Sequence, residues 1–289
     1  MENPLTDPAP SPWENTWPAP AKLNLFLHVV GRRPDGYHLL QTAFRFIDRG
    51  DRLWFSPRSD GRIVLETPIP GVPPETDLTV RAAQILRNET GAVPGVSIRH
   101  DKHLPLGGGL GGGSSDAATV LLALNHLWKL GLSRPQLQSL ALSLGADVPV
   151  FVAGRNAFAE GVGEALTPLD LPPAWYVVVE PGIQVPTAAI FSAPELRRDA
   201  PPLRAADWRP GQGSNDLEPI ACGRFPAVAE ALRALRAVAP RALMTGSGAC
   251  VFAEFDDPAA AARALAALAG RFTAWVAAGL DRHPLAGLD

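Results

Sequence analysis

The first regular pattern of apolar and polar positions begins at residue 21. From Leu23 to Val29 every second position is a leucine or a valine. This period of two is typical of a β-strand, whose successive side chains point to opposite faces. It predicts a strand over residues 21–30, with Lys22 and Asn24 together on the face opposite the leucines.

The rest of the pattern predicts a mixture of helices and strands. Helices are expected where apolar residues recur every three or four positions, and strands where shorter apolar runs are bounded by turn residues. The expected helices cover residues 78–90, 114–130, 133–145, 227–238 and 259–269. The expected strands cover residues 40–46, 62–66, 96–99, 175–179, 250–255 and 272–276, and another starts at residue 53. Because strands and helices do not strictly alternate, we expect an α+β fold rather than a doubly wound sheet.

Two breaks in this pattern divide the chain into an extension and two domains. Residues 1–18 contain five prolines and no periodic pattern, so we expect an irregular N-terminal extension. A turn at Gly161–Gly163, followed by several prolines, precedes the expected strand at residue 175. We therefore predict one domain over residues 19–167 and a second over residues 168–289.

Composition and charge exclude several classes of function. The chain has 289 residues, of which 46% are hydrophobic and 19% charged, as in globular proteins that bury a sizeable core. Its formal net charge of −3 offers no overall attraction to nucleic acid or to an anionic membrane. Two cysteines are too few for a disulfide framework, and the histidines are too scattered for a zinc site. With no long apolar run and no signal-peptide layout, we expect a cytoplasmic protein without nucleic-acid or membrane partners.

The segment with the clearest chemistry is rich in glycine. Six of the seven positions from 107 to 113 are glycine, and the expected helix follows at once. Such a run lets the main chain approach a ligand closely and leaves its N–H groups free. A helix N-terminus adds partial positive charge and unpaired donors, which together bind phosphate. A flexible linker is the alternative, but linkers are rarely flanked by a leucine-rich strand exit and a capped apolar helix.

Three familiar phosphate-binding motifs do not fit this loop. A Walker loop requires Lys followed by Ser or Thr after its last glycine, whereas Ser114 follows Gly113 directly. A dinucleotide fold requires an acidic residue about 20 positions further on, and residues 117–146 contain neither Asp nor Glu. The His-Arg-Asp and Asp-Phe-Gly motifs of protein kinases are absent from the sequence.

The loop from Leu106 to Ser115 resembles the ATP-binding loop of the GHMP kinase superfamily, which phosphorylates small molecules. Segments 20–27, 35–38 and 145–151 narrow the resemblance to a member whose alcohol substrate carries a cytidine diphosphate group. Segments 157–164, 215–219 and 245–248 support it, and it extends over about residues 19–280.

The resemblance implies a two-domain fold and a phosphoryl transfer. The N-terminal ATP-binding domain would contain a mixed sheet with helices, and the C-terminal domain would be a ferredoxin-like α/β sandwich. The γ-phosphoryl group of ATP would pass to a hydroxyl, with Mg²⁺ neutralising the triphosphate charge. We expect a monomer or a weak homodimer.

The same resemblance assigns roles to individual residues. Asp147 is the expected base for the hydroxyl proton, and Lys22 is its expected partner; the chain has only three lysines, so a merely solvated Lys22 fits poorly. Without the resemblance, Asp147 would also fit an ordinary turn after a helix. The expected ATP contacts are Lys102, Pro105, Leu106, Gly107, Gly108, Gly109, Leu110, Gly111, Gly112, Gly113, Ser114 and Ser115, with the two serines as helix caps and ligands. The expected contacts to the acceptor substrate are Asn24, Tyr37, His38, Phe44, Thr187 and Phe191.

Two alternatives remain open from the sequence. The first is another kinase of the superfamily, acting on homoserine or mevalonate. Tyr37 and His38 argue against it, because those substrates offer no base to stack on or to hydrogen-bond. The second is a nucleotide-binding protein without catalysis, which would be expected to lack Lys22 or Asp147, and both are present.

Overall fold

The computed structural model describes residues 11–92 and 94–288. Residues 1–10, which make up most of the expected N-terminal extension, lie outside the described residues. The strands are β1 (Trp17–Arg32), β2 (His38–Arg58), β3 (Ile63–Leu65), β4 (Gly95–Asp101), β5 (Ala157–Glu160), β6 (Ala165–Pro168), β7 (Trp175–Glu180), β8 (Leu243–Met244), β9 (Val251–Phe255) and β10 (Thr273–Leu280). The helices are η1 (Pro12–Glu14), α1 (Leu78–Thr90), α2 (Gly112–Leu127), α3 (Arg134–Leu142), α4 (Val148–Ala153), α5 (Thr187–Phe191), α6 (Glu218–Arg224), α7 (Pro226–Arg236) and α8 (Pro258–Ala267).

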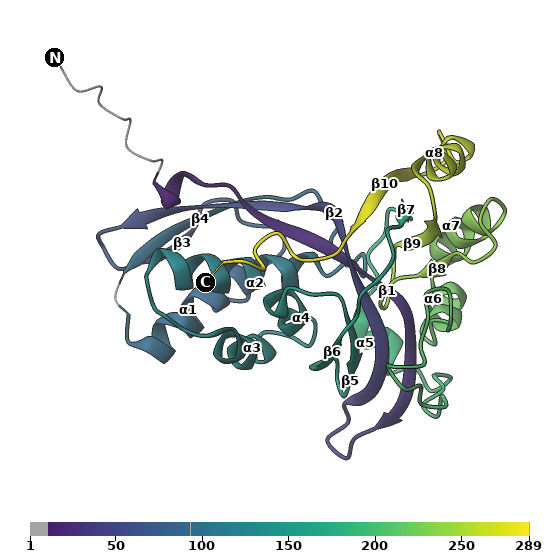
Figure 1. The fold of residues 1–289 in the computed structure, drawn as a ribbon, viewed down its shortest axis with the longest axis horizontal. Helices are drawn as coiled ribbons and strands as arrows, with labels where there is room; N and C mark the ends of the chain where they lie inside the picture. The colour runs from purple at the N-terminus through teal and green to yellow at the C-terminus, as the bar shows by residue number, and fades with distance from the viewer. Residues whose placement is uncertain (1–10, 93, 289) are drawn as a thin grey trace.

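One ten-stranded sheet runs through both halves of the molecule, in the order β3-β4-β2-β10-β7-β9-β8, with β1 and β5 paired to β2. The long antiparallel strands β1 and β2 extend across the molecule (Figure 1). Strand β10 joins the halves, because it pairs with β2 at Gly279 and Leu280 and with β7 from Thr273 to Ala278. Any cleft between the halves is therefore built on a shared sheet.

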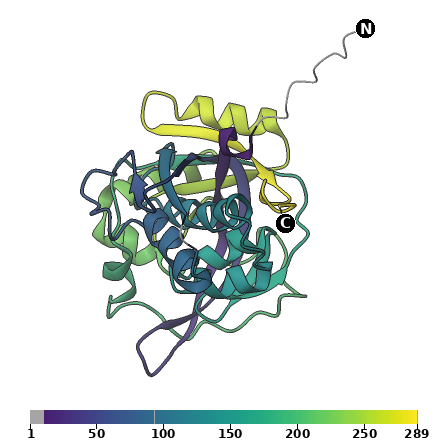
Figure 2. The same cartoon turned by 90° about the vertical axis from the view of Figure 1, so that its left-hand side faces the viewer.

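Helices α1 to α4 pack together against the strands of the first half (Figure 2). Helix α2 lies at their centre and is apolar around nearly its whole circumference, as expected of a buried helix. Two of its hydroxyl groups fix it to β1: Ser115 donates to the carbonyl of Pro20 at 2.7 Å and Thr119 donates to that of Pro18 at 3.0 Å. These two hydrogen bonds fix the position of the first turns of α2 relative to β1.

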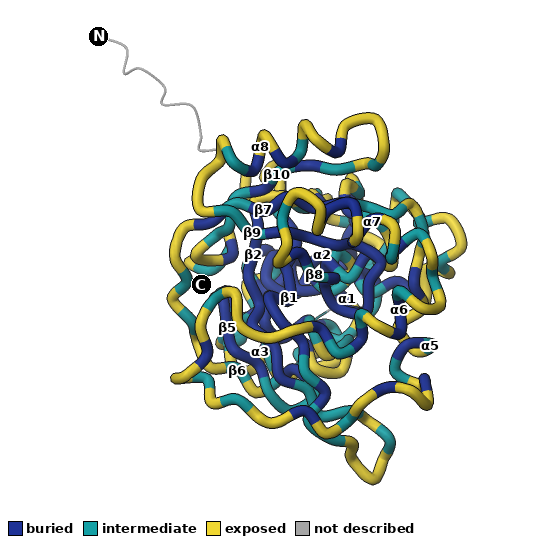
Figure 3. Tube along the Cα trace, turned by 90° about the vertical axis from the view of Figure 1, so that its right-hand side faces the viewer, coloured by how far each residue is buried: buried dark blue, intermediate teal, exposed yellow. Residues whose placement is uncertain are grey.

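The second half follows the chain order β7, helices, β8, β9, α8, β10, and its strands lie in the sheet order β10-β7-β9-β8. This β-α-β-β-α-β order is compatible with the expected ferredoxin-like sandwich. The buried stretches, dark blue in Figure 3, follow β1, β2, β7 and β9 through the middle of the molecule. A hydrophobic cluster of its own packs the helices of this half on β7 and β9.

Several element boundaries differ from those predicted. Strand β1 already begins at Trp17, inside the stretch expected to be irregular, because Trp17 pairs with Leu53 and is buried against Phe55. The strands expected over residues 40–46 and from residue 53 form one continuous β2, since it has partners along its whole length. The Ser133–Gln136 capping box is present, but α3 ends at Leu142 rather than at Gly145.

The residues after β10 return to the first half. The His283 backbone N–H donates to the carbonyl of Gly154 at 3.0 Å. The Arg134 guanidinium donates to the carbonyls of Leu285 at 2.6 Å and Leu288 at 2.8 Å. The C-terminal tail thereby covers α3 and α4, although it lies beyond the second half in sequence.

Candidate active site

A cleft of about 540 Å³ lies where the glycine loop, β1, β2 and the second half meet. Most residues expected at the site line it: Lys22, Asn24, Phe44, Lys102, the whole run from Pro105 to Gly113, Ser114, Asp147, Thr187 and Phe191. Gly246, Ser247 and Gly248 from the second half also line it, next to the glycine loop. The structure therefore brings together residues that are up to about 220 positions apart in the chain.

The glycines of the loop are required by its backbone conformation. Gly107, Gly109 and Gly111 have φ values of 64°, 74° and 73°, in the left-handed region that favours glycine. A Cβ atom at Gly109 would lie 2.1 Å from the carbonyl oxygen of Thr245, which no side chain tolerates. The loop is thus packed closely against the second half at Gly109.

The carbonyl groups of the loop are bound to the protein interior. The carbonyls of Gly107 and Gly108 accept from the N–H groups of Ala249 and Cys250, at 3.0 and 3.1 Å. The carbonyl of Leu110 accepts from the Lys22 N–H at 3.0 Å. The N–H groups of residues 107–111, in contrast, donate to no residue that the structure describes. This arrangement turns the loop into a set of fixed, available donors, as an anion site requires.

Helix α2 starts two residues earlier than predicted. Its N-cap is Gly111, with no side-chain cap, and the first helical residue is Gly112. The expectation that Ser114 and Ser115 cap the helix is therefore wrong. Ser114 lines the cleft, whereas the Ser115 hydroxyl points away and binds the Pro20 carbonyl. The Ser115 side chain holds the helix in place, and only its backbone is near the loop.

Lys22 is fixed by three oxygen atoms. Its Nζ donates to Asn24 Oδ1 at 2.5 Å and to the Gly109 carbonyl at 3.0 Å, and it forms an ion pair with Asp147 Oδ2 at 3.1 Å. The ammonium also lies 5.4 Å from the centre of the Phe44 ring. An ammonium has three N–H donors, so these contacts fix its orientation.

Asp147 sits at the start of α4 and faces the cleft. It is the N-cap residue of α4 but makes no capping hydrogen bond with its side chain. The side chain is 33% exposed, while that of Lys22 is only 3% exposed. The carboxylate is therefore paired with a buried cation on one side and open to a ligand on the other.

Two threonines complete the polar network around Lys22 and Asn24, and neither was predicted from the sequence to lie in the site. Asn24 Nδ2 donates to Thr42 Oγ1 at 2.9 Å, and the Asn24 backbone N–H donates to Thr245 Oγ1 at 3.0 Å. Thr245 in turn donates to the Gly109 carbonyl at 3.2 Å. Thr245 opens the Thr-Gly-Ser-Gly segment, so its place in a glycine-rich motif is the signal that could have found it.

Lys102 lies at the mouth of the cleft between two buried carboxylates. Its Nζ is hydrogen-bonded to Asp51 and, at 2.6 Å, to Asp116. Burial by itself lowers the pKa of Lys102, but the charges of Asp116 and Asp51 outweigh it and raise that pKa. Burial raises the pKa of Asp116 to about 7 in spite of the nearby ammonium. Neither aspartate was singled out in the sequence, although Asp116 directly follows the two serines.

The residues expected to bind a nucleobase lie around Phe191, the one aromatic residue among them that lines the cleft. Tyr37 is 65% exposed at the turn between β1 and β2, and neither it nor His38 lines the cleft itself. The His38 ring packs on the Phe191 ring, with 5.1 Å between centroids. Thr187 Oγ1 lies 2.8 Å from Ser247 Oγ, which joins α5 to the Thr-Gly-Ser-Gly segment.

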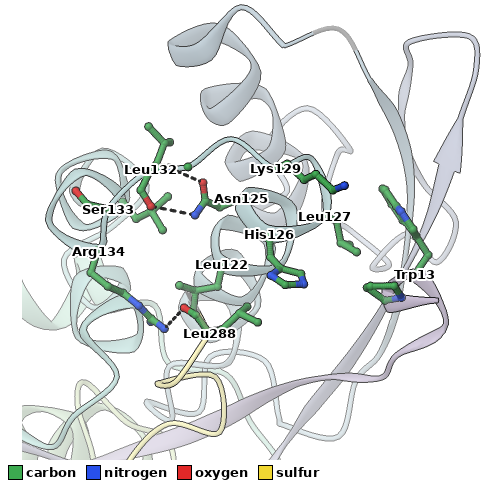
Figure 4. A pocket seen from close by; sticks show the side chains of 13 residues that line it. Trp13, Leu122, Asn125, His126, Leu127, Lys129, Leu132, Ser133, Arg134 and Leu288 are labelled. Atoms are coloured by element: carbon green, nitrogen blue, oxygen red, sulfur yellow. Dashed lines mark hydrogen bonds between the residues drawn. The ribbon is translucent and has the colours of Figure 1, made fainter. Parts of the chain in front are cut away.

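A larger cavity, of about 720 Å³, lies away from this chemistry between η1, α2, α3 and the C-terminal tail (Figure 4). Two polar side chains in its wall are already hydrogen-bonded to backbone groups of neighbouring segments. Asn125 binds both the N–H and the carbonyl of Leu132, and Arg134 binds carbonyls of the tail. The catalytic candidates all lie in the smaller cleft.

The described residues contain no cluster of three or more His, Cys, Asp or Glu side chains arranged to hold a metal ion. They also contain no helix that is both long enough and apolar enough to cross a bilayer.

The fold and the phosphate loop define the class of the protein. Residues 77–155 match the model of the GHMP kinases N terminal domain, and residues 209–274 match that of the GHMP kinases C terminal region. The fold also resembles a homoserine kinase from Cytophaga hutchinsonii (16% identity, TM-score 0.67, covering 93% of this chain and 95% of that one). The chain therefore has the two domains and the mixed sheet and helices of a GHMP kinase.

More similar relatives narrow this class to one family. A 4-diphosphocytidyl-2-C-methyl-D-erythritol kinase from Dechloromonas aromatica is 66% identical over 94% of this chain and 100% of its own length. One from Thiobacillus denitrificans is 61% identical over 93% of this chain and 96% of its own length. A crystal structure of 4-(cytidine 5'-diphospho)-2C-methyl-D-erythritol kinase is 40% identical, with a TM-score of 0.79 over 92% of this chain and 99% of that one. The chain belongs to the family of these kinases.

Proposed function

We propose that the protein transfers the γ-phosphoryl group of ATP to the position-2 hydroxyl of 4-diphosphocytidyl-2-C-methyl-D-erythritol. The products are the 2-phosphate and ADP, and the reaction belongs to non-mevalonate isoprenoid precursor biosynthesis. Membership of the family supports the identity of the acceptor substrate. One structural observation supports the proposed phosphoryl transfer. Lys22 Nζ binds both the phosphate-loop carbonyl of Gly109 and the carboxylate of Asp147, so that the phosphate site and the base share one cation.

Asp147 is the proposed general base. The acceptor hydroxyl oxygen attacks the γ-phosphorus, its proton passes to Asp147, and the bond between the γ-phosphorus and the bridging oxygen of ADP breaks. Lys22 is ion-paired with this carboxylate and offsets charge on the attacking oxygen. Because Lys22 is held by three oxygen atoms, little reorganisation is needed when the substrates bind.

The glycine loop is the proposed site of the triphosphate. The carbonyl groups of the loop are hydrogen-bonded to the protein while its N–H groups are available, which supports a phosphate site there. The N-terminus of α2, which directly follows the loop, supports it as well. Lys102, also in the cleft wall, is the proposed side-chain donor near the phosphates, although Asp51 and Asp116 offset its charge.

The donor set of the cleft fits Mg²⁺ bound with ATP. Ser114 and Asp147 both line the cleft and offer it a hydroxyl and a carboxylate, and Mg²⁺ in kinases is held by few protein oxygens together with phosphates and water. When bound, the ion neutralises triphosphate charge. Ser114 and Asp147 are the residues proposed to face it.

Tyr37, His38 and Phe191 are the proposed contacts to cytosine, with Asn24, Phe44 and Thr187 along the path to the phosphate loop. Support comes from the packing of His38 on Phe191 next to an exposed tyrosine, because aromatic faces stack on bases. A cytoplasmic location and a monomer or weak homodimer remain predictions from the sequence.

The test is an ADP-release assay with ATP, Mg²⁺ and one acceptor at a time. The diphosphocytidyl substrate should be phosphorylated, and phosphorus NMR should place the new phosphate on the position-2 oxygen. Homoserine and mevalonate serve as matched acceptors that lack a base. Turnover with one of these and not with the diphosphocytidyl compound would overturn the assignment while leaving the kinase class intact.

A further inference from the structure

Arg198 lies in the segment after α5 and has four hydrogen bonds. Its Nε donates to His38 Nε2 at 3.0 Å and its Nη1 to the Leu196 carbonyl at 2.7 Å. Its Nη2 donates to the carbonyls of Ala193 at 2.9 Å and Phe191 at 3.3 Å. One guanidinium therefore joins the end of α5 to the first residue of β2, 160 positions away in the chain.

The bond to His38 determines which ring nitrogen carries the proton. A guanidinium remains protonated and only donates, so Nε2 of His38 must accept. A neutral imidazole has one donor and one acceptor, which places the hydrogen on Nδ1. Among the residues that the structure describes, none is hydrogen-bonded to Nδ1. His38 thus presents an unused N–H donor.

The electrostatic surroundings favour the same state. Partial burial, together with the positive charges of Arg198 and of Arg32 on the paired strand β1, lowers the pKa of His38. A protonated ring would carry a hydrogen on Nε2 and would face the Arg198 N–H with a second donor. The neutral Nδ1–H form is therefore the one compatible with this contact.

Arg198 also fixes the aromatic partner. It binds the carbonyl of Phe191, and the Phe191 ring lies 5.1 Å from that of His38 with 36° between the planes. Phe191 lines the cleft, while His38 lies just outside it. A single residue thus sets both the hydrogen-bonding state of His38 and the position of the ring it packs on.

We infer that Arg198 is a specificity-positioning residue, which presents the Nδ1–H group of His38 and the face of Phe191 to the base of the acceptor. This inference rests on the proposed function, which puts a nucleobase at this end of the cleft. The chemistry it selects is a base edge with a hydrogen-bond acceptor. Cytosine has acceptors at N3 and O2, whereas N3 of uracil carries a hydrogen and would oppose the His38 donor.

The experiment compares Arg198→Met with Arg197→Met in the full-length protein. Arg197 is the neighbouring residue; it is exposed and contacts only Asp199, at 3.5 Å, among the described residues. Arg198→Met should raise KM for the diphosphocytidyl substrate about tenfold, with kcat and the KM for ATP nearly unchanged. It should also reduce the preference in kcat/KM for the cytidine substrate over its uridine analogue. Arg197→Met should resemble the wild type in kcat, in both KM values and in the preference for the cytidine substrate.

Nitrogen NMR of the wild-type protein gives a readout that does not depend on a stable variant. The ring nitrogens of His38 should report a hydrogen on Nδ1, and Arg198→Met should raise the His38 pKa. A hydrogen on Nε2 in the wild type, or equal KM and base preference in the two Met variants, would overturn the inference. Absence of turnover by the wild type with the diphosphocytidyl substrate would instead contradict the proposed function, because Arg198 is intact there.

Discussion

The two ends of the cleft differ in how firmly their functional groups are held. At the phosphate end, Lys22 has three oxygen partners and the carbonyls of the glycine loop are bound inward. At the base end, Tyr37 is 65% exposed, and the His38 side chain has one hydrogen bond among the described residues. Groups that stabilise a transition state gain from being fixed in advance, whereas a stacking surface is completed by its ligand. Changes at the phosphate end should therefore reduce kcat, and changes at the base end should raise KM.

The largest expected effect is that of Asp147→Asn. The amide cannot take the hydroxyl proton, so kcat should fall by roughly 10²–10⁴. Steady-state kinetics with both substrates measures it. Because the Asn side chain has nearly the same shape, the KM for the acceptor should change little.

A nucleotide-binding measurement serves as the control for this variant. ATP affinity should remain near the wild-type value, since the loop donors are not altered. Near-normal turnover by Asp147→Asn would show that Asp147 is not the general base.

The second largest effect is expected for Gly109→Ala. The new Cβ would meet the Thr245 carbonyl at 2.1 Å, and φ of 74° is unfavourable for alanine. The loop must shift, and a displacement of about 1 Å near the reacting groups costs on the order of 100-fold in kcat/KM for ATP. Gly131→Ala is the matched control, because it has φ of 70° but open space around it and lies outside the cleft. Equal activity of the two variants would show that close contact at Gly109 is unimportant.

The sequence could predict those parts of the site that depend on local pattern. The period of two in β1 places Lys22 and Asn24 on one face, and the structure joins them at 2.5 Å. The glycine run predicts a loop whose main-chain N–H groups are left free, and among the described residues those of 107–111 donate no hydrogen bond. The cap role of the two serines was assigned wrongly because the helix starts two residues early, and each residue turns a helix by about 100°.

Other features depend on contacts between distant parts of the chain, and local pattern does not encode them. Lys102 pairs with Asp51 across 51 positions, and Arg198 meets His38 across 160. Helices α4 and α5 were not predicted, because six and five residues are too few to show a helical period. Their positions follow from packing on the rest of the molecule.

A smaller effect, confined to substrate binding, is expected for Tyr37→Ala. Stacking of a base on an aromatic ring contributes about 1–3 kcal/mol, so the KM for the diphosphocytidyl substrate should rise about tenfold. The kcat should remain within about twofold, because Tyr37 is far from the groups that react. Tyr37→Phe retains the aromatic face and should behave as the wild type. A drop in kcat without a change in KM would contradict the contrast between the two ends.

The smallest effect concerns stability at the phosphate end. Asp116 is almost fully buried, its Oδ1 has no hydrogen-bond partner among the described residues, and burial raises its pKa from 3.8 to about 7. Between these two values the folded protein binds more protons than the unfolded chain, so this group makes the free energy of unfolding fall as pH rises from about 4 to about 7. Asn at this position carries no titrating proton and can still accept from Lys102. The melting temperature of Asp116→Asn relative to the wild type should therefore rise by a few degrees between about pH 5 and about pH 8. Asp170→Asn, at an exposed carboxylate paired with Arg155, should show no such trend. A difference that stays constant with pH would mean that Asp116 is ionised throughout and that Lys102 fully compensates both carboxylates.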